Sequence, residues 1–260
     1  MKFLTKEQLD FYHKNGYIAV DVFSADEIDE MSREYDEIFQ RKEKDNLEAT
    51  WKGDWKKGKD KLEVKSIHGL QMHSAVFSQT ILHKKLLDVC EDVMGNPNIL
   101  LHHTKAHLKP PGTGSPFPMH QDYHYFPFKN DSMIAVFISL DKSDSENGGL
   151  CVYPGSHLLG PQKDISDSEQ AHYLDPKEFP IEKAVSLPLE RGQKTYSIFL
   201  YTTIYLIKIF KVVIFSYLLI HGSYDNTSDR VRRMFLIQLM SAEDEPSKEL
   251  CTDRLAKEWY

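Results

Sequence analysis

The short run HQDYHYFPF, from His120 to Phe128, constrains the fold of this chain more than any other feature of the sequence. It sets an imidazole and a carboxylate two positions apart in a β-type sequence, and side chains at i and i+2 of a strand point to the same face. His120 and Asp122 can therefore bind one metal ion together. A third ligand would have to come from another strand, so the fold must bring distant strands side by side. On spacing alone, a purely structural His-Asp pair remains the alternative.

A second stretch, about a hundred residues downstream, offers that third ligand. His221 follows the apolar residues Leu218–Ile220, and after a polar turn the chain carries three arginines at positions 230, 232 and 233. Arginine binds carboxylates through a two-pronged fork, so this order would place a carboxylate anchor beside a metal ligand. Two histidines and one carboxylate form the facial triad associated with non-haem Fe(II) oxygenases. The alternative for His221 is a core histidine whose hydrogen bonds are satisfied inside the protein.

Read together, the two stretches resemble the phytanoyl-CoA dioxygenase family of iron and 2-oxoglutarate oxygenases. The resemblance rests on HQDYHYFPF, on NGGLCVYPGSH at Asn147–His157, and on LLIHGS with an arginine eleven residues after its histidine. The N-terminal LTKEQLDFYHKNGYIAV matches more loosely. The resemblance runs from Leu4 to about Ala242, and its motifs are specific in combination.

The resemblance implies a dioxygenase that uses Fe(II), 2-oxoglutarate and O2, with ascorbate as an accessory reductant, to hydroxylate an unactivated C–H bond of a small molecule. An acyl-CoA thioester is one substrate that it suggests. A cupin-like module that binds iron and 2-oxoglutarate without turnover is the rival interpretation. Strand parity supports excluding Arg233 as the anchor, because its side chain would point to the opposite face of the strand from that of Arg232. The implied assignments are His120, Asp122 and His221 as catalytic iron ligands, Arg232 and Ser223 for the 5-carboxylate, and Gln121, Lys65, Phe137 and Lys105 around the cosubstrate.

Charge and cysteine content narrow the class of protein. A formal net charge of −7 and a pI near 5.9 argue against nucleic acid or an anionic membrane as the main partner, since both need a basic face. Three cysteines, far apart and in no C-x-x-C pair, indicate neither a disulfide framework nor a zinc module. We see no signal peptide and no peroxisomal address, and we therefore expect a cytoplasmic protein that is a monomer.

Short strands, Pro/Gly turns and N-terminal helices indicate a mainly β fold with flanking helices, the double-stranded β-helix or jelly roll of the cupins. We expect one domain over residues 1–260, with helices in residues 1–97 and the jelly-roll core in residues 98–242. Capping signals at Thr5 and Ser24 predict two helices, and helical spacing predicts a third from Phe77 to Gly95. The predicted strands span residues 17–20, 99–109, 133–140, 150–153 and 184–189.

The sequence alone leaves two interpretations open for some of the polar segments. The basic loop at residues 52–61 is either a solvated surface or a flap that contacts the phosphates of coenzyme A. Histidines 102, 103 and 107 are close enough for a metal site of their own, but a strand that enters a polar active site also tolerates histidine, and we favour that. His157 follows a Pro-Gly turn and is structural in the family pattern. Residues 162–182 are expected to form a loop or lid.

Residues 194–211, KTYSIFLYTTIYLIKIFK, interrupt the resemblance, and we predict that they do not belong to the functional protein. Removing these 18 residues joins Gln193 to Val212 and restores the short turn of the family pattern. Fourteen of them are Phe, Tyr, Ile, Leu or Lys, and 18 codons make 54 nucleotides, as in a short intron translated in frame. An extra hairpin is the alternative. A membrane span is disfavoured, because Lys208 and Lys211 leave uncharged runs of 13 and 9 where a span needs roughly 20.

Overall fold

The computed structural model describes residues 1–45, 49–51, 64–167, 171–190, 195–200, 203–208 and 212–247. The basic loop at residues 52–61 lies outside the described residues. The strands are β1 (Tyr17–Val20), β2 (Ala49–Trp51), β3 (Val64–His68), β4 (Ile99–Lys109), β5 (Phe117–His120), β6 (Ile134–Ser139), β7 (Leu150–Val152), β8 (Val185–Ser186), β9 (Thr195–Leu200), β10 (Thr203–Lys208), β11 (Val212–Ser216), β12 (His221–Ser223) and β13 (Arg232–Ser241). The helices are α1 (Lys6–Asn15), α2 (Ala25–Asp45), α3 (Ala75–Ile81) and α4 (Lys84–Met94), with short 3-10 turns η1 (Leu70–Met72), η2 (Asp122–His124), η3 (Ser156–Leu159) and η4 (Ile181–Lys183).

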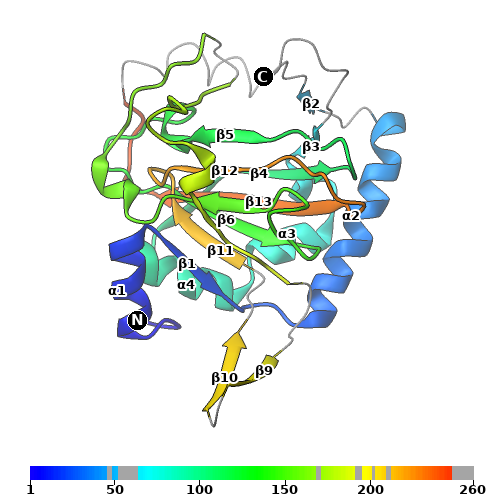
Figure 1. Ribbon diagram of the computed structural model, residues 1–260, viewed down its shortest axis with the longest axis horizontal. Helices are drawn as coiled ribbons and strands as arrows, with labels where there is room; N and C mark the ends of the chain where they lie inside the picture. Colours follow the sequence, from blue (N-terminus) through cyan, green and yellow to red (C-terminus); the bar gives the residue numbers. More distant parts are fainter. Residues whose placement is uncertain are drawn as a thin grey trace.

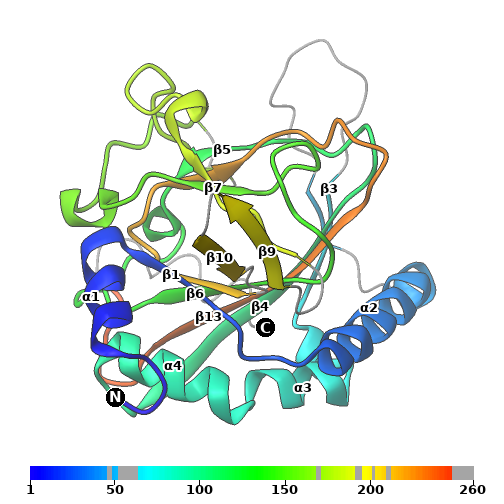
Figure 2. The same ribbon diagram turned by 60° about the horizontal axis from the view of Figure 1, so that its bottom comes forward.

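Apart from β9 and β10, the strands build two facing antiparallel sheets, which confirms the predicted mainly β jelly roll. The larger sheet has the order β1-β11-β6-β13-β4-β3-β2, and the smaller has the order β5-β12-β7-β8. Neighbours in each sheet come from distant parts of the chain, as in the pairing of β1 with β11. Figures 1 and 2 show helices α2, α3 and α4 on one side of the larger sheet and the smaller sheet on the other.

The N-terminal helices begin where the sequence predicts. Thr5 and Gln8 form a capping box at the start of α1, and Gly16 ends that helix in the left-handed conformation. Ser24 and Glu27 make the equivalent contacts before α2. The single helix predicted from Phe77 to Gly95 is wrong, because the chain breaks between α3 and α4. Leu82, which the periodicity counts as a core residue, is 71% exposed at that break.

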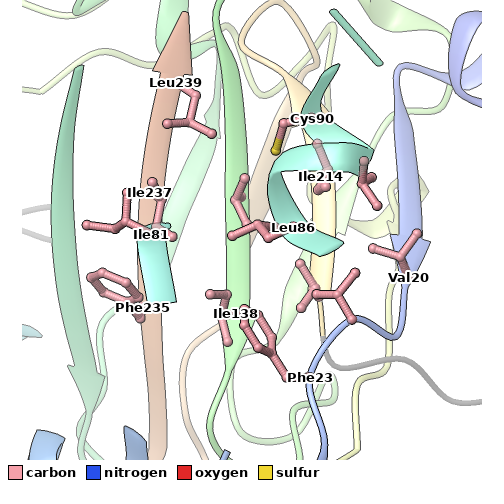
Figure 3. Packing of buried hydrophobic residues seen from close by; sticks show 14 of the residues in the cluster. Val20, Phe23, Ile81, Leu86, Cys90, Ile138, Ile214, Phe235, Ile237 and Leu239 are labelled. Carbon is pink, nitrogen blue, oxygen red and sulfur yellow. The ribbon is translucent and has the colours of Figure 1, made fainter. Parts of the chain in front are cut away.

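Each face of the larger sheet buries a separate apolar cluster, because side chains alternate along its strands. One cluster lies between the sheet and the helices, and Figure 3 shows Ile138, Ile214 and Phe235 from the strands packing against Leu86 of α4. The other lies between the two sheets and joins Phe137 of β6 to Val152 of β7. The polar site described below borders this second cluster, so the fold holds it between two packed layers.

The strand predictions differ from the structure in detail. Strand β4 has the predicted bounds, and β6 and β7 lie within theirs. The strand expected at residues 184–189 is reduced to the two residues of β8, and the described residues between 162 and 180 form no helix or ladder strand. None of the helices among the described residues is long and apolar enough to cross a bilayer.

Strands β9 and β10 form a hairpin that pairs with no other strand in the described part of the chain. In Figure 1 this hairpin projects below the seven-stranded sheet. The next strand, β11, pairs along its whole length with β6 and from Val212 to Phe215 with β1. The segment predicted to be foreign thus forms a separate two-stranded unit, and the strand that follows it keeps its place in the sheet.

Candidate metal centre

Three side chains from the ends of two neighbouring strands meet between the sheets. His120 is the last residue of β5, Asp122 opens η2, and His221 is the first residue of β12. The two histidines are direct cross-strand partners, and the Asp122 Oδ1 atom lies 3.7 Å from each Nε2 atom. The ligand atoms of all three lie within 4.8 Å of one another. The predicted triad is therefore brought together by the pairing of β5 with β12.

Glycine at position 222 allows the two strands to approach this closely. A Cβ atom there would lie 2.7 Å from the carbonyl oxygen of Phe117 and 2.8 Å from the sulfur of Met119. Both distances are shorter than van der Waals contact, so a side chain would push β12 away from β5. The small residue between His221 and Ser223 thus maintains the pairing that aligns the two histidines.

Hydrogen bonds orient both imidazoles toward the centre. His120 Nδ1 lies 2.7 Å from the carbonyl oxygen of Pro118, and His221 Nδ1 lies 2.9 Å from that of Leu219. A carbonyl only accepts, so each Nδ1 must carry a proton and each neutral ring keeps its lone pair on Nε2. Burial and the neighbouring His221 lower the pKa of His120 well below its usual range, which favours this neutral form.

The carboxylate of Asp122 is held by a glutamine that the sequence did not suggest. Gln238 Nε2, from β13 of the larger sheet, donates to Asp122 Oδ2 at 2.7 Å and leaves Oδ1 toward the histidines. Burial raises the pKa of Asp122 above its usual value, and the hydrogen bond from Gln238 offsets part of this increase. The available signal was that Gln238 is polar within an apolar run and has the strand parity of Arg232.

The donor set suits a resident metal ion. Two neutral imidazole nitrogens and one carboxylate oxygen, all buried or nearly so, match the ligands of a non-haem Fe(II) centre with open positions. The outer hydrogen bonds to Pro118, Leu219 and Gln238 are of the kind that orients metal ligands. These residues therefore fit the iron that the sequence pattern implies.

The three neighbouring arginines have different partners. Arg230 forms a fork with Asp144 at 2.9–3.0 Å and also contacts Glu146. Arg233, on the helix side of the sheet, pairs with Asp141 and Asp36 at 2.7 Å. The side chain of Arg232 makes no ion pair or hydrogen bond with the described residues, and its Nε atom is buried without a partner.

Arg232 is a buried cation without an anion from the described residues. It is 2% exposed, and burial lowers its pKa to about 10. Its guanidinium carbon lies 5.6 Å from the centre of the Phe137 ring, on the sheet face that looks toward the smaller sheet. An uncompensated buried charge is costly, so this position is suited to an anionic ligand.

The other residues predicted to surround the cosubstrate do not all lie on the sheet face of Arg232. Phe137 and Lys105 both pair with Leu236 and so share the face of Arg232. Ser223 is buried and accepts a hydrogen bond from Lys109. The backbone of Lys65 pairs with Leu108, which faces the helices, but its side chain lies outside the described part, so its role stays a prediction.

Gln121 has hydrogen-bond partners on the backbone, and its place in the cosubstrate pocket stays a prediction. Its side chain is fully buried and bonds only to backbone, donating to the carbonyls of Leu218 and Gly160 and accepting from the amide of Gln162. In extended backbone its side chain points away from those of its two neighbours. Gln121 therefore fastens the loop after residue 160 to the strand end before His221.

The remaining histidines do not form a second metal site among the described residues. His102 is the extra residue of a β-bulge between β4 and β13, and its Nδ1 lies 2.9 Å from that of His103. One of these nitrogens must accept, so at least one of the two rings is neutral, and burial lowers the pKa of both. His157 Nε2 lies 3.0 Å from the carbonyl oxygen of His13, a structural contact with α1.

Comparison with known proteins supports the sequence resemblance. The family model described as phytanoyl-CoA dioxygenase (PhyH) matches residues 12–195. The chain is 32% identical over 165 residues to a probable phytanoyl-CoA dioxygenase of Caenorhabditis elegans, an alignment that covers 59% of this chain and 53% of that protein. It is 28% identical over 257 residues to the peroxisomal phytanoyl-CoA dioxygenase of Homo sapiens, covering 92% and 69% respectively.

Solved structures agree on the fold. One is the carbocyclase SnoK from nogalamycin biosynthesis, described as non-haem and α-ketoglutarate dependent. It superposes with a TM-score of 0.74 at 20% identity, over 97% of this chain and 90% of the SnoK chain. EctD from S. alaskensis with bound Fe gives a TM-score of 0.66 at 19% identity. The superposition covers 92% of this chain and 77% of the EctD chain. The chain spans about half the length of most of the curated relatives it matches.

Proposed function

The chain belongs to the phytanoyl-CoA dioxygenase family, and from this premise we propose that it is an Fe(II)- and 2-oxoglutarate-dependent dioxygenase. The observation that carries the proposal is the unpaired, buried Arg232, on the same face of β13 as the Gln238 that holds Asp122. A ligand that binds a metal at one end and has a carboxylate at the other would meet both requirements. 2-Oxoglutarate has this shape and charge.

Each residue then has a defined task. The Nε2 atoms of His120 and His221 and the Oδ1 atom of Asp122 would hold the metal, and Arg232 would bind the distal carboxylate of the cosubstrate. Iron and 2-oxoglutarate supply, with dioxygen, an oxidant able to attack an unactivated C–H bond. Three protein ligands leave three of six positions open for cosubstrate and dioxygen. Since Asp122 fills the position that a halide would need, we propose hydroxylation.

We propose a small organic molecule as substrate, with an acyl-CoA thioester as the first class to test. The support is that the C. elegans and human relatives are named as phytanoyl-CoA dioxygenases. Another relative, from Stutzerimonas stutzeri, is named as a hypophosphite dioxygenase, so the family name alone does not select the substrate.

Succinate release by the purified protein tests the proposal. Protein loaded with Fe(II) is given 2-oxoglutarate, O2 and a panel of acyl-CoA thioesters and small acids, in chloride buffer. We expect one class to stimulate succinate release and to gain a hydroxyl group by mass spectrometry, and we expect His221→Ala to abolish both. Binding of iron and 2-oxoglutarate without succinate from any candidate would favour the non-catalytic module, and a chlorinated product would refute hydroxylation.

A further inference from the structure

A second buried cation lies beside Arg232 and has no part in the roles assigned so far. Lys109, the last residue of β4, is 0% exposed and is the direct cross-strand partner of Arg232. Its Nζ atom donates at 2.6 Å to Ser223 Oγ and at 2.6 Å to the carbonyl oxygen of Tyr224. No carboxylate among the described residues lies within ion-pair distance of this ammonium group.

The lysine is tightly enclosed, so its ammonium group has little freedom. A Cβ atom on Gly148, whose φ is +77°, would lie 2.9 Å from Nζ, and one on Gly114 would lie 2.8 Å from the Lys109 Cβ. The ring centre of Phe117 lies 5.2 Å from Nζ on another side. Burial and the charge of Arg232 lower the pKa of Lys109 well below its usual range, and a bound anion would offset both effects.

The hydrogen bond from Lys109 determines what Ser223 can do. A hydroxyl has one proton, and Ser223 Oγ already accepts from the ammonium group. Its own proton has no acceptor among the described residues, and neither does the Nε–H of Arg232. Cβ atoms of direct cross-strand partners are about 5 Å apart, so Lys109 connects the serine to the arginine.

We propose, on the basis of the function proposed above, that Lys109 is a positioning residue for the cosubstrate: it holds Ser223 as a donor to the carboxylate bound by Arg232. The lysine adds a second positive charge next to that carboxylate. The site then favours a ligand with a negative charge at its distal end over one that ends in an apolar group.

Equilibrium binding to the full-length protein tests this role without turnover. The ligands are 2-oxoglutarate and 2-oxopentanoate, which has a methyl group in place of the distal carboxylate, titrated without oxygen into protein loaded with Fe(II). We expect Lys109→Met to weaken 2-oxoglutarate binding about 10- to 100-fold and to change 2-oxopentanoate binding less than about twofold. Lys109→Gln, which keeps a donor and removes the charge, serves if the first variant does not fold.

A double variant tests whether Lys109 acts through the serine. Ser223→Ala combined with Lys109→Met should bind 2-oxoglutarate no more weakly than Lys109→Met alone. Equal losses for the two ligands would mean that Lys109 only supports the fold, and additive losses would mean that it acts independently of Ser223. If the unaltered protein fails to bind 2-oxoglutarate, the proposed function itself fails. If only Arg232→Ala loses binding, the role of Lys109 alone is refuted.

Discussion

At the scale of single residues, the orientation of the Asp122 carboxylate depends on a hydrogen bond from the larger sheet. Gln238 donates to Oδ2 and so orients Oδ1 toward the two histidines. We expect Gln238→Met, which keeps the size and removes the donor, to weaken Fe(II) binding about 10- to 100-fold by calorimetric titration. Gln71→Met is the matched control, since Gln71 bonds Thr104 away from the triad. Equal affinities in the two variants would show that the hydrogen bond does not orient the ligand.

The two arginines at positions 230 and 232 permit a similar comparison. Arg232→Ala should raise the KM for 2-oxoglutarate about 30- to 1000-fold, because a charge-assisted bidentate contact with a buried carboxylate is worth roughly 2–4 kcal/mol. Arg230 is committed to Asp144 and Glu146, so Arg230→Ala should change KM little. Steady-state kinetics with varied 2-oxoglutarate measures both. Similar increases would mean that Arg232 is not the anchor.

The sequence was most informative where two ligands share one motif. The spacing of His120 and Asp122 and the position of Arg232 eleven residues after His221 are local, so both can be read without knowing the topology. Gln238 and Lys109 could not be found in this way, because their roles depend on which strands become neighbours. The backbone partners of Gln121 could not be read from the motif either, because they come from the segments around Leu218 and Gly160.

At the scale of elements, the hairpin β9–β10 lies outside the two larger sheets. It pairs only with itself among the described residues, whereas β11 pairs with both β1 and β6. We expect a variant without residues 194–211, with Gln193 joined to Val212, to fold, to bind Fe(II) as tightly as the full chain and to be more soluble. Sequencing the transcript should show messages without the 54 nucleotides. A soluble, active long form encoded by the only message would show that the hairpin belongs to the protein.

The elements predicted best are those with strong local signals. Capping residues located the starts of α1 and α2, and alternation located β4. The break between α3 and α4 was missed because the apolar spacing continues through it. Leu82 fits that spacing but faces solvent, while His83 begins a new helix. Periodicity alone cannot separate two short helices whose apolar faces happen to be in phase.

At the scale of the whole molecule, buried histidines make stability depend on pH. Burial lowers the pKa of His102 to about 4 and lowers that of His103 well below its usual range, while an unfolded histidine titrates near 6.5. Between these values the unfolded chain binds more protons at these sites, so their contribution to the free energy of unfolding is fully present above pH 6.5 and is lost as the pH decreases toward 4. We expect His102→Gln to flatten this slope, measured by urea unfolding of metal-free protein. An unchanged slope would mean that His102 does not contribute.

The pairing of β1 with β11 also determines how late β1 can pair during synthesis of the chain. Tyr17 of β1 pairs with Phe215 of β11. Strand β1 can therefore join the sheet only after about 200 further residues have been synthesised. At roughly 5–20 residues per second, a ribosome needs roughly 10–40 s to synthesise that stretch. Throughout this interval Ile18 and Val20, which end buried against the helices, have no strand beside them. Strand β1 is therefore a segment on which a chaperone could find apolar side chains exposed during synthesis.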